Sequence, residues 1–315
     1  MGWAGKSIFY NIAEKIKLIN SKIDQVLKQQ KDVVLGGWGV HALPELQILN
    51  RFNVPIVYEF LTYLMSLTSP AVKTGNILNK KIINRLDGRI LTSHRMLGYL
   101  KNNFGIEHGK NLIFGEYYSK RCFYRERLPR LSEKDGEPHI IFIGYNTNEV
   151  FGQISKILQQ KIHVHTLQNK SFEQRLKGLK ANTYSHSFKK FTFSDFVDGT
   201  FATFMTQFDA CLCTYDFQKK VMLDRFYYSI PERFSFATTA GIPIIMPFGY
   251  LKVCEDIINN YQTGFTYQGY DDLKNSLTNN NLMTMYQKNA VANSKKFNLE
   301  NNFEILNRFL RNIRA

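Results

Sequence analysis

The stretch SIPERFSFATTAGIPII, residues 229–245, decides how this chain is expected to fold. Pro231 presets the backbone at the start of a helix, where the unpaired N–H groups and the helix dipole form an anion site. Arg233 adds a guanidinium fork that suits phosphate. Small residues from Ala237 onward let the helix lie close to a sheet, and Gly241-Ile242-Pro243 forces a sharp return into a strand. The stretch therefore predicts a helix–strand unit with an anion site where the helix begins.

The residues around this stretch alternate between short apolar runs and helical patterns. Buried strands are expected at 139–143, 162–165, 209–214, 244–246 and 264–266. Helices are expected at 148–160, 196–207, 232–240 and 251–260, whereas the polar region 171–190 fits no element clearly. Strands that alternate with helices imply a parallel sheet. The second half is thus predicted to be a doubly wound, Rossmann-like domain spanning residues 137–298.

The first half repeats this pattern on a smaller scale. Strands are expected at 32–35, 55–59, 88–92 and 111–114, with helices at 7–30, 44–52, 74–86 and 94–104. Residues 125–138 have little apolar patterning and are the best linker, so an N-terminal Rossmann-like domain is expected over residues 1–130. Residues 299–315 carry apolar side chains at helical spacing and are expected to form a helix that packs back on the first domain. Two such domains place a ligand cleft between the carboxyl ends of two parallel sheets.

The chain is strongly basic. Its 315 residues carry a net charge of +15, and residues 1–134, with 21 Lys and Arg against 10 Asp and Glu, hold +11 of it. A basic half favours a polyanionic partner, either nucleic acid, anionic lipid or a phosphorylated substrate. No nucleic-acid-binding motif accompanies the charge, which argues against nucleic acid. A general excess of Lys, with no partner, explains the charge as well.

The cysteines and the termini bear on location. Cys211 and Cys213 lie in one apolar run and, in a strand, would share a face. No second pair completes a zinc spacing, so buried free thiols in a reducing compartment are expected. The chain has no apolar run long enough to span a membrane, and residues 1–17 lack the continuous apolar core that a signal peptide is expected to have. We expect a cytoplasmic location, with peripheral membrane contact through the basic half left open, as are homo- and hetero-oligomers.

The 229–245 stretch resembles the C-terminal signature of GT-B glycosyltransferases, especially the retaining family 4 type, also called glycosyltransferase group 1. Arg233 stands where the family often has Lys, and Gly241 and Pro243 match its Gly-x-Pro. The resemblance covers 135–270 well and 32–120 loosely. It implies a GT-B fold with an abbreviated N-terminal domain. It further implies a hexosyltransferase-type enzyme that moves a sugar from a nucleotide-diphosphate sugar, UDP- or GDP-linked, to a hydroxyl of a glycan, lipid-linked or protein-linked acceptor.

The resemblance also implies which residues form the site. The second domain would bind the donor through Gly144, Tyr145, Asn146, His186, Tyr215, Asp216, Arg225, Pro231, Phe234 and Ser235. The first domain would bind the acceptor through Gly36, Gly37 and Trp38. The catalytic candidates are Arg233, Glu232, His41 and Glu59. Arg233 would offset charge on the departing diphosphate.

No cofactor and no metal are expected, because family 4-like enzymes are usually metal-independent. His163 and His165 share a strand face like a metal pair, but the sequence shows no third ligand, and catalytic zinc wants three. Two departures from the family pattern bear on activity. Phe236 replaces the carboxylate that usually holds the donor ribose, and neutral residues replace the Arg and Lys that usually follow the strand ending at Gly144. The alternative is therefore an inactive GT-B homologue that serves as partner subunit of an active transferase.

Overall fold

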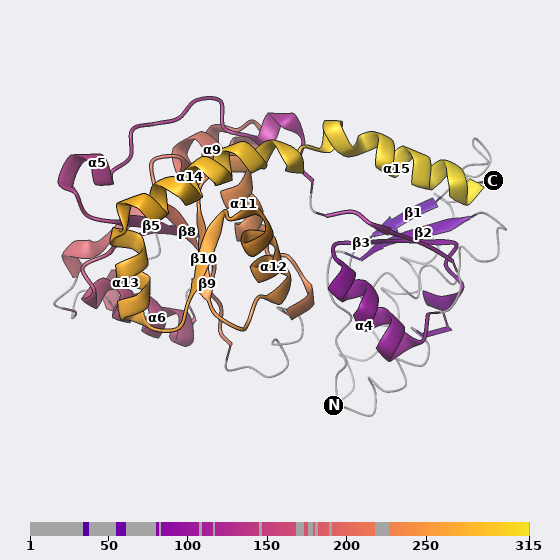
Figure 1. Cartoon of the computed structure of the whole chain (residues 1–315), viewed down its shortest axis with the longest axis horizontal. Helices are drawn as coiled ribbons and strands as arrows, with labels where there is room; N and C mark the ends of the chain where they lie inside the picture. Colours follow the sequence, from indigo (N-terminus) through magenta and orange to yellow (C-terminus); the bar gives the residue numbers. More distant parts are fainter. Residues whose placement is uncertain are drawn as a thin grey trace, which may run out of the picture. The chain divides into compact units, whose positions relative to one another are not determined.

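The computed structural model of the chain describes residues 34–37, 55–60, 80–81, 83–106, 109–115, 117–144, 147–167, 173–175, 179, 182–188, 191–217 and 227–314. The chain divides into two compact units. Unit 1 comprises Met1–Phe114 with Ile305–Ala315, and unit 2 comprises Gly115–Glu304. Each unit contains its own parallel sheet (Figure 1). The expected helices at 7–30 and 44–52, and most of the one at 74–86, lie outside the described residues.

Unit 1 has a four-stranded parallel sheet among its described residues, in the order β1-β2-β3-β4. The strands are β1 (Val34–Gly37), β2 (Ile56–Phe60), β3 (Gly88–Leu91) and β4 (Lys110–Ile113). Helix α4 (His94–Phe104) follows β3 and matches the predicted helix at 94–104. The Ser93 hydroxyl caps it by accepting the Met96 N–H at 3.1 Å, and it ends at Gly105, whose φ of 58° favours glycine. Gly36 and Gly37, predicted to follow the first strand, lie inside β1.

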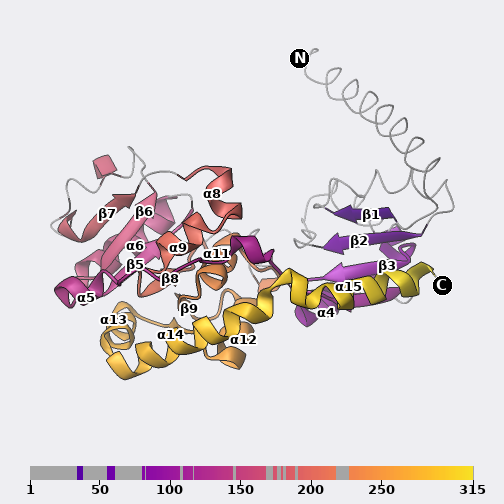
Figure 2. The same ribbon diagram turned by 90° about the horizontal axis from the view of Figure 1, so that it is seen from above.

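The last helix of the chain, α15 (Leu299–Arg314), contributes its residues from Ile305 onward to unit 1. A β-carbon on Gly88 would lie 2.8 Å from Ile313 Cδ1 and 3.0 Å from Phe309 Cζ, so the end of α15 packs tightly on β3. Figure 2 shows the two elements side by side. The absence of a side chain at Gly88 is what lets the helix approach this closely.

In the part of unit 2 that the structure describes, six parallel strands form a sheet in the order β10-β9-β8-β5-β6-β7. Its strands are β5 (His139–Phe142), β6 (His163–Leu167), β7 (Ser185–Phe188), β8 (Ala210–Leu212), β9 (Ile244–Pro247) and β10 (Gly264–Tyr267). This is the strand order of a doubly wound Rossmann-type domain, in which the winding reverses between β5 and β8. Strand β7 lies in the region 171–190, where the polar sequence had predicted no element.

Helices cover both faces of this sheet (Figure 1). On one face, Ile141 packs in a cluster with side chains of α9 (Thr200–Met205), α11 (Glu232–Ala240) and α12 (Lys252–Tyr261). On the other, Ile140 packs with side chains of α6 (Asn148–Gln159), α13 (Tyr270–Thr278) and α14 (Asn280–Ser294). Burial on both sides explains the continuous apolar runs that predicted these strands. Cys211 and Cys213 belong to the same face, as the alternation of side chains predicted, and both are free thiols.

Two expectations for unit 2 need correction. The helix expected at 196–207 is broken into α8 (Phe193–Val197) and α9, because Gly199 has a φ of 83° and a β-carbon there would overlap the Phe123 carbonyl oxygen. The domain boundary falls at Phe114/Gly115, not within residues 130–137.

The segment expected to be a linker is held to unit 2 by hydrogen bonds from its main-chain N–H groups. The Arg125 N–H donates to the Thr203 hydroxyl at 3.0 Å, and the Leu131 N–H donates to the Gln207 carbonyl at 2.9 Å. The Leu128 N–H donates to the Thr206 hydroxyl at 2.9 Å. These bonds need no apolar pattern, so the composition of the segment could not reveal them. Among the helices that the structure describes, none is long and apolar enough to cross a membrane.

Candidate functional site

Helix α11 begins at the centre of unit 2, where the winding of the sheet reverses. Pro231 adopts an extended conformation, with φ −81° and ψ 146°, and occupies the cap position, one residue before the predicted one. The Phe234 N–H donates to the Pro231 carbonyl at 2.8 Å. No described side chain caps this end. The N–H groups of Glu232 and Arg233 have no acceptor within the helix and are therefore available to an anion.

The Arg233 side chain lies at the carboxyl ends of β5 and β8. Its Cζ lies 3.8 Å from the centroid of the Tyr215 ring and 4.8 Å from that of Phe142. Its Nη1 donates to the Thr214 carbonyl. Gly144 leaves room for the guanidinium, since a β-carbon there would overlap Nη2, and its φ of 144° is one that favours glycine. The fold thus brings together Gly144, Tyr215 and Arg233, which the sequence had proposed separately.

The electrostatics of this position point to an anion. The Arg233 residue is only 7% exposed. Among the described residues, no carboxylate forms an ion pair with it, although other cations of unit 2 such as Lys252 and Arg130 do have one. A buried guanidinium with no opposing charge is costly unless something compensates it. A phosphate group at the start of α11 would supply that charge and would also meet the positive end of the helix dipole.

Helix α6 holds the loop after β8 in place. Gln153 donates from Nε2 to the Tyr215 carbonyl at 3.1 Å, and its Oε1 accepts the Thr214 hydroxyl. The Thr147 hydroxyl caps α6 by accepting the Val150 N–H at 3.3 Å. Because α6 starts a few residues after β5, its N-terminus lies at the same edge of the sheet as that of α11. Two helix N-termini and one buried guanidinium therefore surround the reversal point of the sheet.

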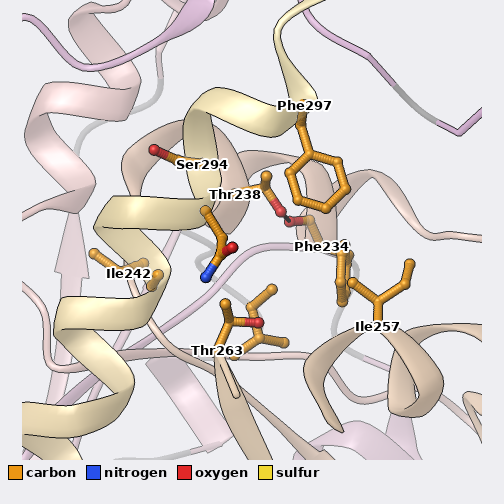
Figure 3. Close-up of a pocket in the computed structure, with 10 residues that line it drawn as sticks. Phe234, Thr238, Ile242, Ile257, Thr263, Ser294 and Phe297 are labelled. Atoms are coloured by element: carbon orange, nitrogen blue, oxygen red, sulfur yellow. Dashed lines mark hydrogen bonds between the residues drawn. The ribbon is translucent and has the colours of Figure 1, made fainter. Parts of the chain in front are cut away.

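Three residues proposed to bind the donor lie in the interior or in the sheet of unit 2. Phe234 is 3% exposed and lines a small pocket with Ile257 and Phe297 (Figure 3). Ser235 is also buried and shares a hydrogen bond with the Tyr118 hydroxyl. Successive helical residues point about 100° apart, so a helix that aims Arg233 at the sheet edge turns its next two residues into the core.

The third is His186, which lies in β7 and not in a loop. It is the register partner of His165, which pairs with Ile141 of β5, so it stands three residue levels before Gly144. Its Nε2 is 2.7 Å from His163 Nδ1. Asp216 is partly buried next to Tyr215, and Glu232 is exposed. Tyr145, Asn146 and Arg225 lie outside the described residues.

Solved structures match this geometry, whereas no protein-family model matches the chain and no curated protein matches its sequence significantly. Sucrose-phosphate synthase from Thermosynechococcus elongatus matches with a TM-score of 0.69 and 13% identity, over 95% of this chain and 78% of that one. Anabaena HepE in complex with UDP matches with a TM-score of 0.68 and 13% identity, over 94% and 82%. A glycosyltransferase from Rickettsia africae matches with a TM-score of 0.64 and 16% identity, over 94% and 82%. The chain has the GT-B fold.

This result confirms the predicted fold class, with unit 2 as the C-terminal Rossmann-like domain of the GT-B fold and unit 1 as the N-terminal one. In unit 1, Gly37 and Glu59 are register partners near the carboxyl ends of β1 and β2. Burial raises the pKa of the Glu59 carboxyl above its ordinary value of 4.5. Trp38 and His41, the other candidates from this domain, lie outside the described residues.

Sequence reasoning missed a cluster of histidines in unit 2, near the amino ends of the strands in its sheet. Strand pairing places His139 beside His163 and His165 beside His186, all on one face of the sheet. The rings of His139 and His163 stack with centroids 4.2 Å apart. Burial, and then the neighbouring imidazoles of His186, His139 and His163, lower the pKa of His165 to about 3.

The sequence had predicted no metal, because it showed no third ligand beside His163 and His165. His163 meets His139 and Asp135 instead, and the ligand atoms of these three residues all lie within 4.8 Å of one another. The signal in the sequence was His139 at the head of a strand. It becomes informative only when the register of β5 against β6 is known.

Proposed function

We propose that this protein is a glycosyltransferase that moves a sugar from a nucleotide-diphosphate sugar to a hydroxyl acceptor. The observation that carries the proposal is the buried Arg233 guanidinium, which has no described carboxylate partner and lies beside the open N-terminus of α11 at the reversal point of the sheet. Solved structures of the same fold support the choice of donor, because HepE is described in complex with UDP and with UDP-glucose. We therefore propose a UDP-linked donor first and a GDP-linked one second.

The proposed chemistry depends on stabilisation of the leaving group. The bond between the anomeric carbon and the diphosphate oxygen breaks, and the acceptor oxygen bonds to that carbon while its proton is released. Arg233 and the N–H groups at the start of α11 stabilise the negative charge that develops on the departing diphosphate. Retention of the anomeric configuration is part of the proposal and rests on the family resemblance alone.

Unit 1 is proposed to bind the acceptor. Gly36 and Gly37 would let the acceptor approach the main chain closely at the end of β1, and Trp38 would stack its aromatic ring on a sugar. Glu59 and His41 are the candidates to position the acceptor hydroxyl. The charge of +11 in residues 1–134 suits an anionic, lipid-linked acceptor at a membrane surface, with the protein in the cytoplasm.

A second candidate function is that of an inactive partner subunit, which the packing of Phe236 favours. Its ring lies 5.0 Å from that of Phe196 and 5.5 Å from that of Phe201, measured between centroids. The position of the ribose-binding carboxylate is thus occupied by an aromatic contact, and Glu232, the nearest acid, is exposed. A chain of this second kind would keep the GT-B fold and lose the donor.

Calorimetry with a panel of UDP-, GDP- and ADP-sugars separates the two functions. A transferase gives heat of binding with one nucleotide class and releases the free nucleotide when an acceptor is supplied. An inactive homologue gives no heat with any of them. Absence of binding across the whole panel, with a folded protein, would refute the assignment of unit 2 as a donor domain.

A further inference from the structure

The amino end of the sheet in unit 2 carries a second group of functional side chains, at the opposite end of the strands from Arg233. His139 and His163 are the first residues of β5 and β6 and are register partners. The short helix α5 (Ser132–Asp135) ends at Gly136, whose φ of 77° turns the chain so that Asp135 faces His139. Figure 2 shows α5 beside the start of β5. The loop that follows brings Glu137 to His163.

The nitrogen and oxygen atoms of these residues converge. Asp135 Oδ2 lies 2.9 Å from His139 Nε2 and 4.0 Å from His163 Nε2. Glu137 Oε2 lies 2.7 Å from His163 Nε2. A tetrahedral Zn²⁺ ion, with bonds of roughly 2.0–2.2 Å to nitrogen and oxygen, needs ligand atoms roughly 3.3–3.6 Å apart. The observed separations lie on both sides of that range, so small rotations of the Asp135 and Glu137 carboxylates would be enough to bind an ion.

The second nitrogen of each ring already has a partner. His139 Nδ1 is 2.9 Å from His165 Nε2, and His163 Nδ1 is 2.7 Å from His186 Nε2. A histidine that binds metal through Nε2 must carry its proton on Nδ1, and metal sites fix that tautomer with an outer hydrogen-bond acceptor. His165 and His186 are placed to be those acceptors. The arrangement thus has both the inner ligands and the outer partners of a built metal site.

The location of the group also suits a metal. His139 is buried and His163 is partly buried, whereas Asp135 is exposed, so the ion would have rigid ligands on the strands and an open path from solvent. Two imidazoles with one or two carboxylates are ligands of first-row divalent ions such as Zn²⁺, and they do not suit Ca²⁺ or Mg²⁺.

We propose that Asp135, His139 and His163, with Glu137 as fourth ligand, bind a first-row divalent transition-metal ion at the amino edge of the unit 2 sheet. The ion joins the α5–β5 connection to β6. Its role is structural, because His139 and Gly144 are five residues apart on an extended chain, about 16 Å, which keeps the ion away from Arg233. The inference is independent of the proposed transferase function.

The test uses the full chain after removal of metal by a chelator and dialysis. Titration with Zn²⁺ in the calorimeter should show one ion per chain, and Co²⁺ as a spectroscopic substitute should develop the visible absorption of a tetrahedral nitrogen–oxygen site. Asp135→Asn and His163→Gln should each weaken Zn²⁺ binding at least about tenfold. Asp135 is exposed, so Asp135→Asn is expected to fold normally.

His94→Gln is the matched control, because His94 is an exposed histidine on α4 of unit 1. It should bind Zn²⁺ like the unaltered chain. Zn²⁺ should also raise the midpoint of thermal unfolding of the unaltered chain and of the control, and it should leave that of His163→Gln unchanged.

The proposal is overturned if the metal-free chain binds neither Zn²⁺ nor Co²⁺, which would make the cluster two hydrogen-bonded His–carboxylate pairs. Zn²⁺ binding of equal strength in Asp135→Asn and His163→Gln would also overturn it. UDP binding measured on the same metal-free protein tests the transferase proposal separately, so failure of one leaves the other intact.

Discussion

Replacement of Arg233 by Met tests the central feature of the proposed donor site. Met matches the aliphatic part of the Arg side chain and removes the positive charge and the donors. A hydrogen bond to a charged group contributes about 1.5–3 kcal/mol, and two such bonds to a diphosphate would contribute at least about 3 kcal/mol. Because 1.4 kcal/mol corresponds to tenfold in affinity, we expect the Kd for UDP to rise at least about 100-fold.

The fold should tolerate this change. The variant loses the hydrogen bond to the Thr214 carbonyl and the cation–π contact with Tyr215, each of order 1 kcal/mol. It also removes a buried cation that has no described counter-charge, which is favourable. The two effects oppose each other, so the free energy of unfolding should change by less than about 2 kcal/mol. Urea unfolding and calorimetry with UDP on the same sample separate stability from binding.

Two further variants sharpen the result. Arg233→Lys keeps the charge but loses the planar fork, so its affinity for UDP should lie between those of Met and Arg. Arg130→Met is the matched control, because Arg130 is paired with Glu133 at 2.9 Å and lies in the segment before β5. It should bind UDP as the unaltered chain does. A folded Arg233→Met that binds UDP with unchanged Kd, while the unaltered chain binds it specifically, would refute the phosphate role.

Three other predictions follow from single positions. Gly144→Ala should weaken UDP binding and cost about 1–3 kcal/mol of stability, because the backbone at this position favours glycine and the added β-carbon would displace Arg233. Gly136→Ala is the control, because its backbone is equally strained at φ 77° but the space around it is open. It should leave the affinity for UDP, measured by calorimetry, unchanged. Glu59→Gln should raise the midpoint of thermal unfolding at pH 7.5 and change it little at pH 4. The pKa of Glu59 is raised in the folded protein, so the buried carboxylate costs stability as the pH rises above 4.5. An equal gain at both pH values would contradict burial of the charged carboxylate as the reason. Gly199→Ala should lower the urea midpoint, because its β-carbon meets the Phe123 carbonyl, and an unchanged midpoint would show that the segment before β5 can shift without cost.

Local pattern was sufficient for much of this fold. Apolar runs predicted the strands of both units that the structure describes, except β7, whose residues Ser185–Phe188 are mostly polar at the edge of the sheet. An edge strand pairs on one side and is partly solvated, so it lacks the apolar run that marks a buried strand. Helix 196–207 failed for a related reason, because Gly199 in the middle of the pattern adopts a conformation set by its contact with Phe123.

Within helix α11, too, some features could be predicted from the sequence and others could not. Pro231, Arg233 and the Gly241-Ile242-Pro243 turn could be assigned from sequence, because a helix start, a nearby guanidinium and a glycine turn are local properties. The direction of each side chain could not. Arg233 faces Gly144 and Tyr215, whereas Phe234 and Ser235 face the core, and only the orientation of α11 against the sheet decides which residue points where.

The sequence alone determined that this chain alternates strands and helices in two parallel α/β domains, since hydrophobic periodicity and turn residues act over a few neighbours. Tertiary structure alone decided the rest. It held the expected linker to Thr203 of α9 and to Gln207 by hydrogen bonds from main-chain N–H groups, and it gathered His139, His163, His165 and His186 on one face. The histidine cluster depends on which strands pair and in what register, and that is set by packing of the whole domain, not by any segment of it.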